Sequence, residues 1–367
     1  MGMPRSLPLT FSVVIPAYNE EKGMAACIES VLSQSIRPDQ VVVINDGSTD
    51  RTAEILKRYS RRITVVHLGR NTGNKALALR AALPIVRGDI VVYTDGDSEL
   101  DPEAIEKILP HFFDAEVGGV SGVVRSRRHN AITGMRELQY IMGQEVYKRG
   151  MDVTSSVMVI PGCVGAVRKE LFDPSPDTVT EDMDLTLSVL ERGYKVVYEP
   201  GAVSWTSDPP NLGSYIRQTR RWFAGFFQSA RKHFRRLPVR LKVQIAFLTM
   251  ENVLFFFLAI SLLISKAVGL QGRAIATFIS ADLISWTGIA FYGIARRSRW
   301  DLLASVPLML LSRPVDSVLW MHAMVNELIL VRKDLSWRRS DRFDLREKRT
   351  KSPPKAGPSS TTALERV

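Results

Sequence analysis

The stretch that decides the fold is Ile90-Val91-Val92-Tyr93-Thr94-Asp95-Gly96-Asp97. Its first four residues form a short apolar run that is typical of a buried β-strand, and the chain becomes polar directly after it. The two carboxylates that follow are two residues apart, and the glycine between them permits a tight bend, so both can bind one hard divalent cation. A diphosphate would complete the ligands of such an ion. An acidic turn that binds no metal is the alternative interpretation.

The same alternation of apolar runs and polar ends precedes this stretch. Apolar runs at 12–15, 40–44 and 63–66 alternate with helical patterns at 21–33, 51–59 and 75–83. This order predicts an α/β fold built from βαβ units with a parallel sheet. Ligands of such sheets bind beyond the carboxyl ends of the strands. Because the polar clusters Pro16–Glu20 and Asn45–Asp50 follow the first two runs, we expect both clusters to lie beside Asp95.

Two polar clusters also have a purely structural interpretation. Asn45-Asp46-Gly47-Ser48 fits a turn followed by a helix cap as well as it fits a ligand site. The cluster Thr180–Asp184 precedes a helical pattern at 185–192 that Gly193 closes, and it fits a capping turn because acidic residues stabilise the start of a helix. A carboxylate of this second cluster could instead remove a proton from an acceptor hydroxyl. The residues leave these alternatives open.

The composition excludes several classes of protein. The chain has 367 residues, of which 45% are hydrophobic, and a net charge of +11 from 49 Lys+Arg against 38 Asp+Glu. Such a chain forms one large or two modest domains and is too apolar to be a disordered protein. Its two cysteines, Cys27 and Cys163, are too few for a disulfide-stapled secreted domain and favour a reducing compartment. The five histidines have no zinc-site spacing with either cysteine.

The long apolar stretches lie after residue 240. The stretches 243–268 and 274–295 hold few charges, and each is long enough to cross about 30 Å of hydrocarbon as a helix. A third stretch, 302–331, contains Arg313, Pro314 and Asp316 and fits a broken span, a re-entrant hairpin or an interfacial helix. The first apolar run of the chain is too short for a signal peptide or an amino-terminal membrane helix.

The basic residues predict an orientation in the membrane. If the first 240 residues are cytosolic, two spans return the chain to the cytosol at Arg296, Arg297 and Arg299, in agreement with the positive-inside tendency. A complete third span would place the basic stretch 332–355 outside, so charge favours a third segment that enters and leaves on one side. We therefore expect a multi-pass protein of the cell membrane with a cytosolic catalytic domain. The final residues are rich in Pro, Ser and Thr and are expected to be disordered.

A basic amphipathic helix is predicted around Gln218-Thr219-Arg220-Arg221-Trp222. A helix of this kind can lie on the surface of an anionic membrane leaflet. In addition, Arg221 could pair with a departing diphosphate, and Trp222 could stack on a sugar ring. Nucleic acid is the other common partner of such charge, but the adjoining apolar stretches make membrane lipids the expected partner, and no nucleic acid is expected.

Five motifs occur in order along the chain. They are Val14–Glu20, Asn45–Asp50, Asp95–Asp97, Thr180–Asp182 and Gln218–Trp222. Together they resemble inverting family 2 glycosyltransferases, in particular the membrane synthases of β-linked polysaccharides such as cellulose, chitin, hyaluronan and poly-N-acetylglucosamine. The resemblance covers residues 11–230. It implies a GT-A-like nucleotide-sugar-binding domain with a mainly parallel sheet, followed by interfacial and transmembrane α-helices.

The resemblance also implies roles for individual residues. Asp182 would be the catalytic base, and Asp97 would bind Mg²⁺ or Mn²⁺. The residues implied to bind the donor or the acceptor are Ala17, Tyr18, Glu20, Asp46, Lys75, Asp95, Glu181, Gln218, Arg221 and Trp222. The loop Pro161–Gly165 resembles the acceptor-side loop of the family. Asn45 departs from the family pattern, because many relatives have Asp there, and this change removes a charge near the expected base contacts.

The resemblance implies a membrane-bound inverting glycosyltransferase that moves a sugar from a UDP-sugar to a growing β-linked glycan, with a slight preference for UDP-N-acetylglucosamine. One alternative is a single-sugar transferase that acts on a polyprenyl-phosphate or other lipid acceptor. Another is a membrane-bound sugar-nucleotide sensor or scaffold that is not an enzyme. Relatives usually carry membrane helices before the catalytic domain, and this chain is not expected to have them. Either an export channel is then built from fewer helices, by association with other chains such as a homo-oligomer, or the protein does not export a polymer.

The expected organisation follows from these motifs and apolar stretches. It comprises a glycosyltransferase domain at 1–212, amphipathic interfacial helices at 213–242, a membrane region at 243–331 with two to three hydrophobic segments, and a basic, disordered cytosolic tail at 332–367.

Overall fold

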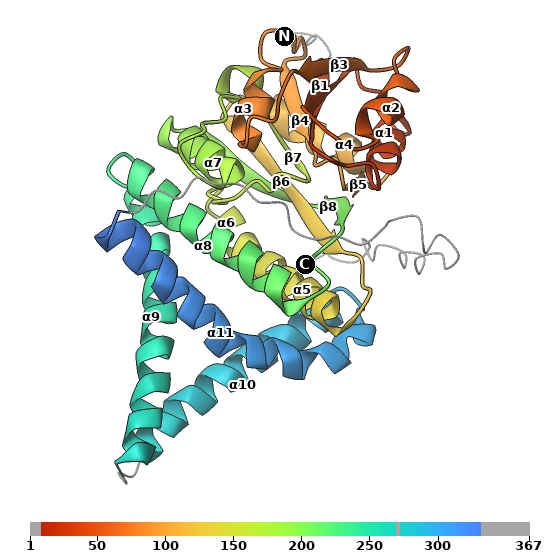
Figure 1. The fold of residues 1–367 in the computed structure, drawn as a ribbon. Helices are drawn as coiled ribbons and strands as arrows, with labels where there is room; N and C mark the ends of the chain where they lie inside the picture. The colour runs from red at the N-terminus through yellow and green to blue at the C-terminus, as the bar shows by residue number, and fades with distance from the viewer. Residues whose placement is uncertain (1–8, 269–271, 332–367) are drawn as a thin grey trace, which may run out of the picture.

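The structure is a computed structural model that describes residues 9–268 and 272–331. An α/β domain holds the first part of the chain, and long helices lie beneath it (Figure 1). The tail at 332–367, which the sequence predicts to be disordered, lies outside the described residues.

The α/β domain is built on one eight-stranded sheet with the strand order β3-β2-β1-β4-β7-β6-β8-β5. The strands are β1 Phe11–Ala17, β2 Gln40–Asp46, β3 Thr64–Leu68, β4 Ile90–Tyr93, β5 Glu99–Leu100, β6 Val117–Ser126, β7 Gly165–Arg168 and β8 Lys195–Thr206. Strands β1 to β4 are parallel, as the apolar runs predict. Strand β7 is antiparallel to both β4 and β6, so the second half of the sheet is mixed. The expected mainly parallel sheet is confirmed.

Helices cover both faces of the sheet. They are α1 Met24–Leu32, α2 Thr52–Lys57, α3 Lys75–Arg80, α4 Ala104–Ile108, α5 Ala131–Met142, α6 Arg149–Asp152 and α7 Glu181–Glu191. Successive residues of β1 enter different cores, with Val13 and Ile15 in one and Val14 in the other. Because side chains alternate across a strand, a parallel strand with helices on both faces must be apolar throughout. This requirement explains the continuous apolar runs of the sequence.

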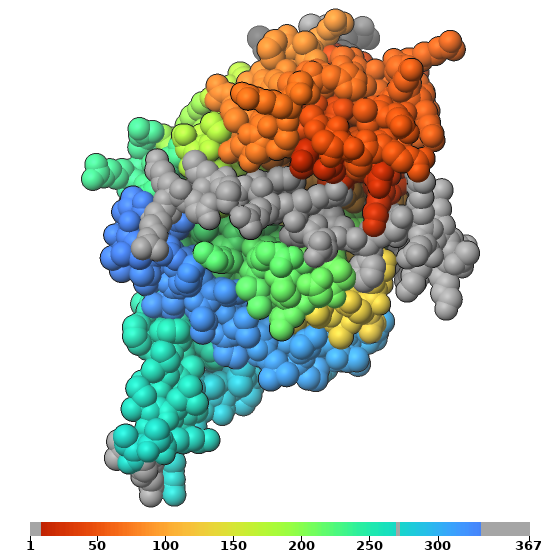
Figure 2. All heavy atoms as spheres, viewed as in Figure 1, coloured from red at the N-terminus to blue at the C-terminus, as the bar shows by residue number. Residues whose placement is uncertain are grey.

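Within residues 9–268 and 272–331, four long helices follow the sheet. They are α8 Leu212–His233, α9 Val239–Ala267, α10 Arg273–Arg296 and α11 Val306–Met324, and α11 continues a 3₁₀ turn at Trp300–Ser305 and runs on into a π-helical turn at Val325–Ile329. The far ends of α9 and α10 project from the rest of the molecule (Figure 2). By length and composition, α9, α10 and the run 300–329 could each cross a membrane. The first of these helices begins four residues before the predicted start at 243.

The third apolar segment is one helical run, although Pro314 lies inside it. The re-entrant hairpin and the broken span considered from the sequence are therefore wrong. Of the most apolar 18 residues of this run, 39% are buried inside the protein, against 6% for the corresponding stretches of α9 and of α10. The run lies beside α8, with which it shares an extensive contact (Figure 1). This burial distinguishes α11 from the two helices that present their apolar side chains outward.

A buried carboxylate joins the α/β domain to the helical region. The side chain of Glu137 on α5 is fully buried and accepts bonds from Arg125 Nη1 at 3.1 Å and from Arg299 Nη1 at 2.7 Å. It also accepts the backbone N–H of Ser126 at 2.6 Å. Arg125 belongs to β6, whereas Arg299 follows α10, so one carboxylate connects two regions that are far apart in the sequence.

Glu137→Ala is expected to lower the free energy of unfolding by about 3–5 kcal/mol, because it leaves the nearly buried Arg125 without its counter-ion and leaves Arg299 with Asp301 alone. Denaturant unfolding in detergent micelles measures the change. The control is Glu103→Ala, which removes an exposed ion pair with Lys107 and should leave the midpoint unchanged. Equal midpoints for both variants would show that Glu137 does not join the two regions.

Candidate active site

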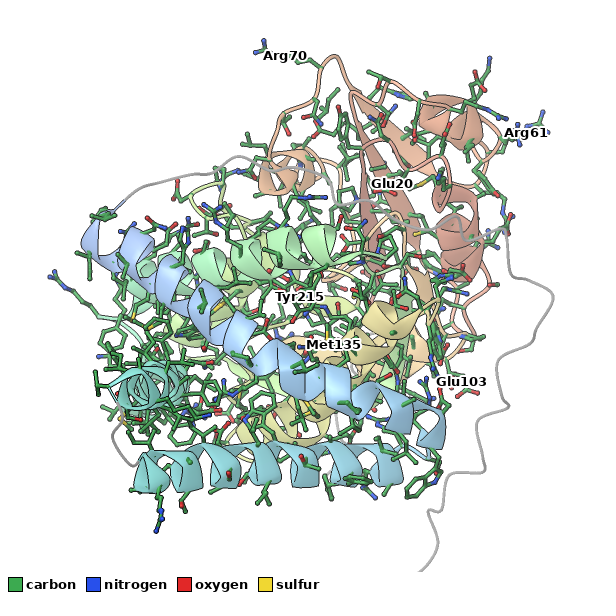
Figure 3. All side chains as sticks on the ribbon, turned by 60° about the horizontal axis from the view of Figure 1, so that its bottom comes forward. Glu20, Arg61, Arg70, Glu103, Met135 and Tyr215 are labelled. Atoms are coloured by element: carbon green, nitrogen blue, oxygen red, sulfur yellow. The ribbon has the colours of Figure 1, made fainter. Side chains whose placement is uncertain are left out.

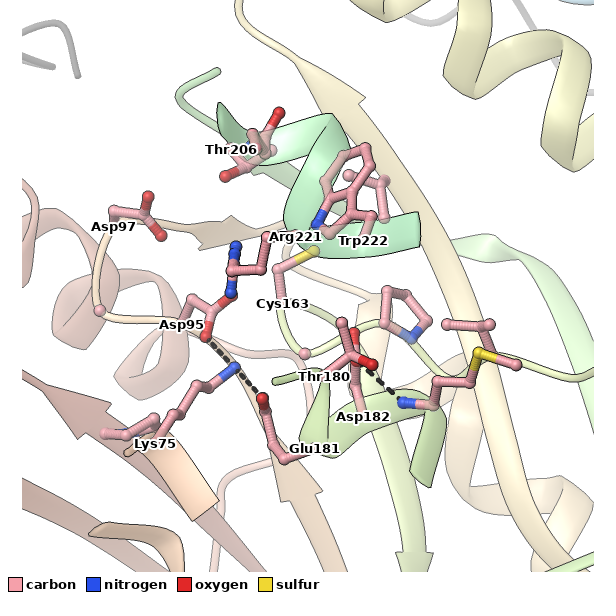
Figure 4. A pocket seen from close by; sticks show the side chains of 18 of the residues that line it. Lys75, Asp95, Asp97, Cys163, Thr180, Glu181, Asp182, Thr206, Arg221 and Trp222 are labelled. Atoms are coloured by element: carbon pink, nitrogen blue, oxygen red, sulfur yellow. Dashed lines mark hydrogen bonds and ion pairs between the residues drawn. The ribbon is translucent and has the colours of Figure 1, made fainter. Parts of the chain in front are cut away.

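A cavity of about 440 Å³ opens at the carboxyl ends of β1, β2 and β4, and α7 and α8 contribute to its walls (Figure 4). All twelve residues that the sequence analysis assigns to the site line this cavity. They are Ala17, Tyr18, Glu20, Asp46, Lys75, Asp95, Asp97, Glu181, Asp182, Gln218, Arg221 and Trp222. Side chains as far apart in the chain as Ala17 and Trp222 therefore share one space, although their individual roles remain predictions.

The first two polar clusters are bonded to each other. Asn19 adopts a left-handed backbone conformation with φ 55°. Its side-chain oxygen accepts the backbone N–H of Thr49 at 2.7 Å, and its own N–H donates to Ser48 Oγ at 3.0 Å. Asparagine tolerates this conformation better than most residues. The loop after β1 is thereby held against the loop after β2, beside Asp46.

Asn45 and Asp46 have different roles in the turn after β2. Asn45 Oδ1 accepts the N–H of Ser48 at 3.1 Å, as the turn interpretation predicts. Asp46 is 4% exposed, and its carboxylate accepts the N–H of Thr72 at 2.9 Å, the Thr72 hydroxyl at 2.8 Å and Asn71 Nδ2 at 3.2 Å. Asp46 therefore orders the loop that leads into α3, where Lys75 is the first residue. The sequence analysis did not identify this function of Asn71 and Thr72.

Lys75 connects two carboxylates across the cavity. Its ammonium lies 2.6 Å from Asp95 Oδ1 and 2.7 Å from Glu181 Oε1 (Figure 4). Burial by itself would lower the pKa of Lys75, but Asp95, Glu181 and Asp182 outweigh it and hold that pKa well above its usual value. Gly162 makes room for this group, because a Cβ there would collide with Lys75 Nζ. Lys75 is therefore a permanent cation of the site.

Asp182 has the properties of a base that functions near neutral pH. Burial and the neighbouring Glu181 raise its pKa from 3.8 to about 6, although Lys75 and Arg221 act in the opposite direction. Its Oδ1 accepts the backbone N–H of Met183 at 2.8 Å. The helix α7 begins at Glu181 and not at 185, so both acidic residues lie in its first turn. Thr180 precedes the helix and makes no side-chain capping bond, but the acidic residues lie at the start of the helix, as the structural interpretation expects.

The walls of the cavity carry an excess of negative charge. The acidic residues are Glu20, Asp46, Asp95, Asp97, Glu181, Asp182 and Asp208, and the basic ones are Lys75 and Arg221. An anionic diphosphate would be repelled by this arrangement unless a further cation accompanied it.

The donor set fits a magnesium or manganese ion that arrives with a diphosphate. Residues 9–268 and 272–331 contain no group of three or more His, Cys, Asp or Glu side chains suited to a metal ion. Asp97 is 4% exposed and lies two residues after Asp95. Mg²⁺ typically binds one or two carboxylates together with phosphate oxygens and water, so two carboxylates are sufficient. The remaining ligands must then come from the diphosphate and water.

Helix α8 lies directly against the start of α7. A Cβ at Gly225 would collide with the side chain of Thr180, so the close approach of the two helices requires glycine there. Further along, the ring of His233 bonds Asp184 at 3.0 Å and Glu191 at 2.6 Å, both on α7. Burial alone would lower the pKa of His233, but these two carboxylates raise it. These contacts hold the α8 side chains Gln218, Arg221 and Trp222 over the cavity.

The family model described as "Glycosyl transferase family 2" matches residues 12–173. This part of the chain is a family 2 glycosyltransferase domain. The matched segment contains Asp46, Lys75, Asp95 and Asp97 but ends before Glu181, so it includes residues expected to bind the donor or the metal ion and not the expected base.

Two proteins similar to this chain have names that refer to N-acetylglucosamine. An N-acetylglucosaminyltransferase of Azorhizobium caulinodans is 28% identical over 261 residues, which cover 65% of this chain and 64% of that protein. A poly-beta-1,6-N-acetyl-D-glucosamine synthase of Staphylococcus aureus is 29% identical over 220 residues, which cover 58% of this chain and 53% of that protein. The chain thus spans about half to two thirds of the length of these relatives.

A solved structure shares the fold. The mannosyltransferase of Pyrobaculum calidifontis, solved in complex with GDP-Man and Mn²⁺, superposes with a TM-score of 0.60 at 19% identity and covers 89% of both chains. The expected GT-A-like fold is confirmed.

Several residues that line the cavity of the glycosyltransferase domain were not predicted. Tyr140 and Asp208 are bonded to each other, with Tyr140 OH donating to Asp208 Oδ1 at 2.8 Å. Phe223 and Phe226 form an apolar part of the wall. Asp208 follows β8 in the polar sequence Thr206-Ser207-Asp208, and this polar end of a strand was a signal that could have identified it. Tyr140 has no comparable signal in the sequence.

We expect Asp182 to titrate with a pKa of about 6, and we expect Glu181→Gln to lower that pKa because it removes a neighbouring negative charge. Carbon NMR of the protein labelled with ¹³C at the aspartate carboxyl carbons measures the titration, and Asp182→Asn identifies the resonance. A matched control is Glu54→Gln, which removes an exposed carboxylate outside the cavity. A pKa of Asp182 near the usual 3.8, or one that Glu181→Gln leaves in place, would contradict the electrostatic account.

Proposed function

We propose that this protein is a membrane-bound inverting glycosyltransferase that transfers a sugar from a UDP-sugar to a growing β-linked glycan. The observation that carries the proposal is the convergence of Asp97, Asp182 and Arg221 on one cavity of a family 2 glycosyltransferase domain. An inverting transfer needs a bound sugar nucleotide, charge compensation for its diphosphate, an acceptor hydroxyl and a base. The cavity offers groups suited to each of these tasks.

The proposed reaction is a single displacement. The acceptor hydroxyl oxygen attacks the anomeric carbon and forms the new glycosidic bond, while the bond from that carbon to the diphosphate breaks and UDP leaves with the electron pair. Asp182 accepts the hydroxyl proton. With a pKa of about 6 it is mostly deprotonated at neutral pH, yet more basic than an ordinary aspartate. The rate is therefore expected to fall as the pH drops below about 6, where Asp182 becomes protonated.

Asp97, assisted by Asp95, would hold a divalent cation on the diphosphate. When bound, Mg²⁺ or Mn²⁺ neutralises negative charge on the departing UDP. Arg221 supplies a second positive charge from α8, and Lys75 keeps Asp95 and Glu181 from repelling the donor. Ala17, Tyr18, Glu20 and Asp46 would bind the nucleotide. The neighbour with the same fold was solved with Mn²⁺, which supports this assignment.

N-acetylglucosamine is the proposed sugar, because two relatives are named for its transfer or polymerisation. Trp222 and Gln218 would contact the acceptor end. We place the α/β domain in the cytosol and the apolar helices in the cell membrane as a multi-pass anchor, since three helices among the described residues have the length and composition of spans.

A lipid-linked acceptor is the second candidate. The cavity wall formed by Phe223 and Phe226 is apolar, and it lies on α8 beside the apolar helix α11. A single transfer to a polyprenyl-phosphate would use such a wall and would need no export channel.

Asp182→Asn should lower sugar transfer about 10²–10⁴-fold, because the acceptor hydroxyl loses its base, and should leave UDP binding close to that of the wild type. Purified protein incubated with a panel of radiolabelled UDP-sugars, followed by separation of lipid-linked product from long polymer, measures transfer and discriminates the two acceptors. Glu54→Gln, outside the cavity, is the control. Normal turnover of Asp182→Asn would remove this residue from the mechanism, and an inactive wild type would favour a sensor or scaffold.

Mn²⁺ should bind weakly to the protein alone and tightly together with UDP, because the described residues supply too few ligands by themselves. Asp97→Asn should abolish the UDP-dependent gain in affinity. Calorimetric titration of Mn²⁺ with and without UDP measures both effects. An Mn²⁺ affinity that UDP does not change, or that survives Asp97→Asn, would overturn the assignment of Asp97.

A further inference from the structure

Arg136 on α5 is a buried cation in contact with Trp222. The residue is 5% exposed, and its guanidinium carbon lies 4.7 Å from the centre of the Trp222 ring and 4.2 Å from the centre of the Tyr215 ring. Both aromatic residues belong to α8. A guanidinium between two ring faces is attracted to both, and the attraction is strongest where water is excluded. Arg136 therefore restricts how the Trp222 ring can turn.

Hydrogen bonds hold the guanidinium in this place. Arg136 Nη2 donates to Thr219 Oγ1 at 2.8 Å, and Nη1 donates to Gln139 Oε1 at 3.0 Å. Within the part of the chain that the structure describes, no ion pair of Arg136 with a carboxylate is found. Its orientation thus depends on Gln139 and Thr219 and on the two rings.

The same network reaches the third apolar helix. Tyr215 OH donates to Asp316 Oδ1 at 2.7 Å, and Gln139 Nε2 donates to Asp316 Oδ2 at 3.2 Å. Gln139 Nε2 also lies 3.0 Å from Tyr215 OH. Asp316 belongs to α11, and Figure 3 shows Tyr215 in the layer where α5, α8 and α11 meet. A continuous set of contacts thus runs from Asp316 through Gln139 and Tyr215 to Arg136.

Trp222 also lines the cavity. Its ring centre lies 6.2 Å from that of Tyr140, and Tyr140 is fixed by its bond to Asp208. Trp222, Tyr140 and Asp208 all line the cavity, whereas Arg136 and Asp316 do not. Arg136 and Asp316 can therefore affect a ligand in the cavity only through Trp222 and the other side chains that they position.

We propose that Arg136 is a positioning residue for Trp222 and that Asp316 of α11 fixes Arg136 through Gln139 and Tyr215. The third apolar helix then belongs to the acceptor side of the catalytic unit. The kinetic consequence of this inference rests on the proposed function, in which Trp222 contacts the acceptor. Small displacements of a group that orients a reactant have large effects on rate.

The direct test is ¹⁹F NMR of protein labelled with 5-fluorotryptophan in detergent micelles, with Trp222→Phe identifying the resonance. Arg136→Met and Asp316→Asn should shift or broaden the Trp222 resonance. Arg125→Met is the matched control, since Arg125 is a similarly buried arginine that pairs with Glu137 and does not contact Trp222. An unchanged Trp222 resonance in Arg136→Met would overturn the proposal whether or not the protein transfers a sugar.

Kinetics test the consequence for the acceptor. Arg136→Met should raise the acceptor KM about tenfold while the donor KM changes less than twofold, and Arg136→Lys should restore part of the loss because it keeps a cation near the rings. The effect of Arg136→Met should shrink in a Trp222→Phe background, since coupled residues are not additive. Equal increases in both KM values, or additive effects, would overturn the proposal. A responsive resonance in a protein without transferase activity would instead contradict the proposed function and leave the positioning of Trp222 intact.

Discussion

The site depends on the ammonium group of Lys75, which lies 2.6 Å from Asp95 and 2.7 Å from Glu181. Asp95 follows β4, whereas Glu181 opens α7, so this one cation connects the carboxyl end of the sheet to the helix that carries Asp182. Without it, like charges would repel one another across a cavity whose walls are predominantly acidic. Lys75 also limits how far the pKa of Asp182 rises. The loop after β4 and the helix that carries Asp182 are thus linked by the two ion pairs of one lysine.

The third apolar segment packs directly behind a wall of the cavity. Helix α8 forms one wall of the cavity and lies along α11. Trp320 of α11 packs against Phe223 and Phe226, with ring centres 4.8 Å from each, and both phenylalanines line the cavity. The apolar part of the cavity wall is therefore supported by the third apolar segment. Such packing explains why this segment is more buried than α9 and α10.

The first half of the fold could be predicted because β1 to β4 and their helices follow one another along the chain and leave a local pattern. The position of β7 between β4 and β6 could not, because it depends on pairing between distant segments. Motif residues such as Asp97 and Asp182 were recognisable, whereas Tyr140 reaches the cavity only through the packing of α5. The charge of Arg313 looked like an interruption of an apolar stretch. In the structure it pairs with Glu251 at 3.1 Å and Asp282 at 3.4 Å, partners on two other helices.

The central claim is that distant acidic residues surround one sugar donor, with the base on the acceptor side. An experimental structure of the protein in lipid nanodiscs with Mn²⁺ and a non-hydrolysable UDP-sugar tests it most directly. The account predicts the diphosphate and the ion beside Asp97, with Arg221 near the phosphates and Asp182 facing the anomeric carbon from the side opposite the diphosphate. A nucleotide bound elsewhere, or an Asp182 carboxylate on the same side as the diphosphate, would contradict it.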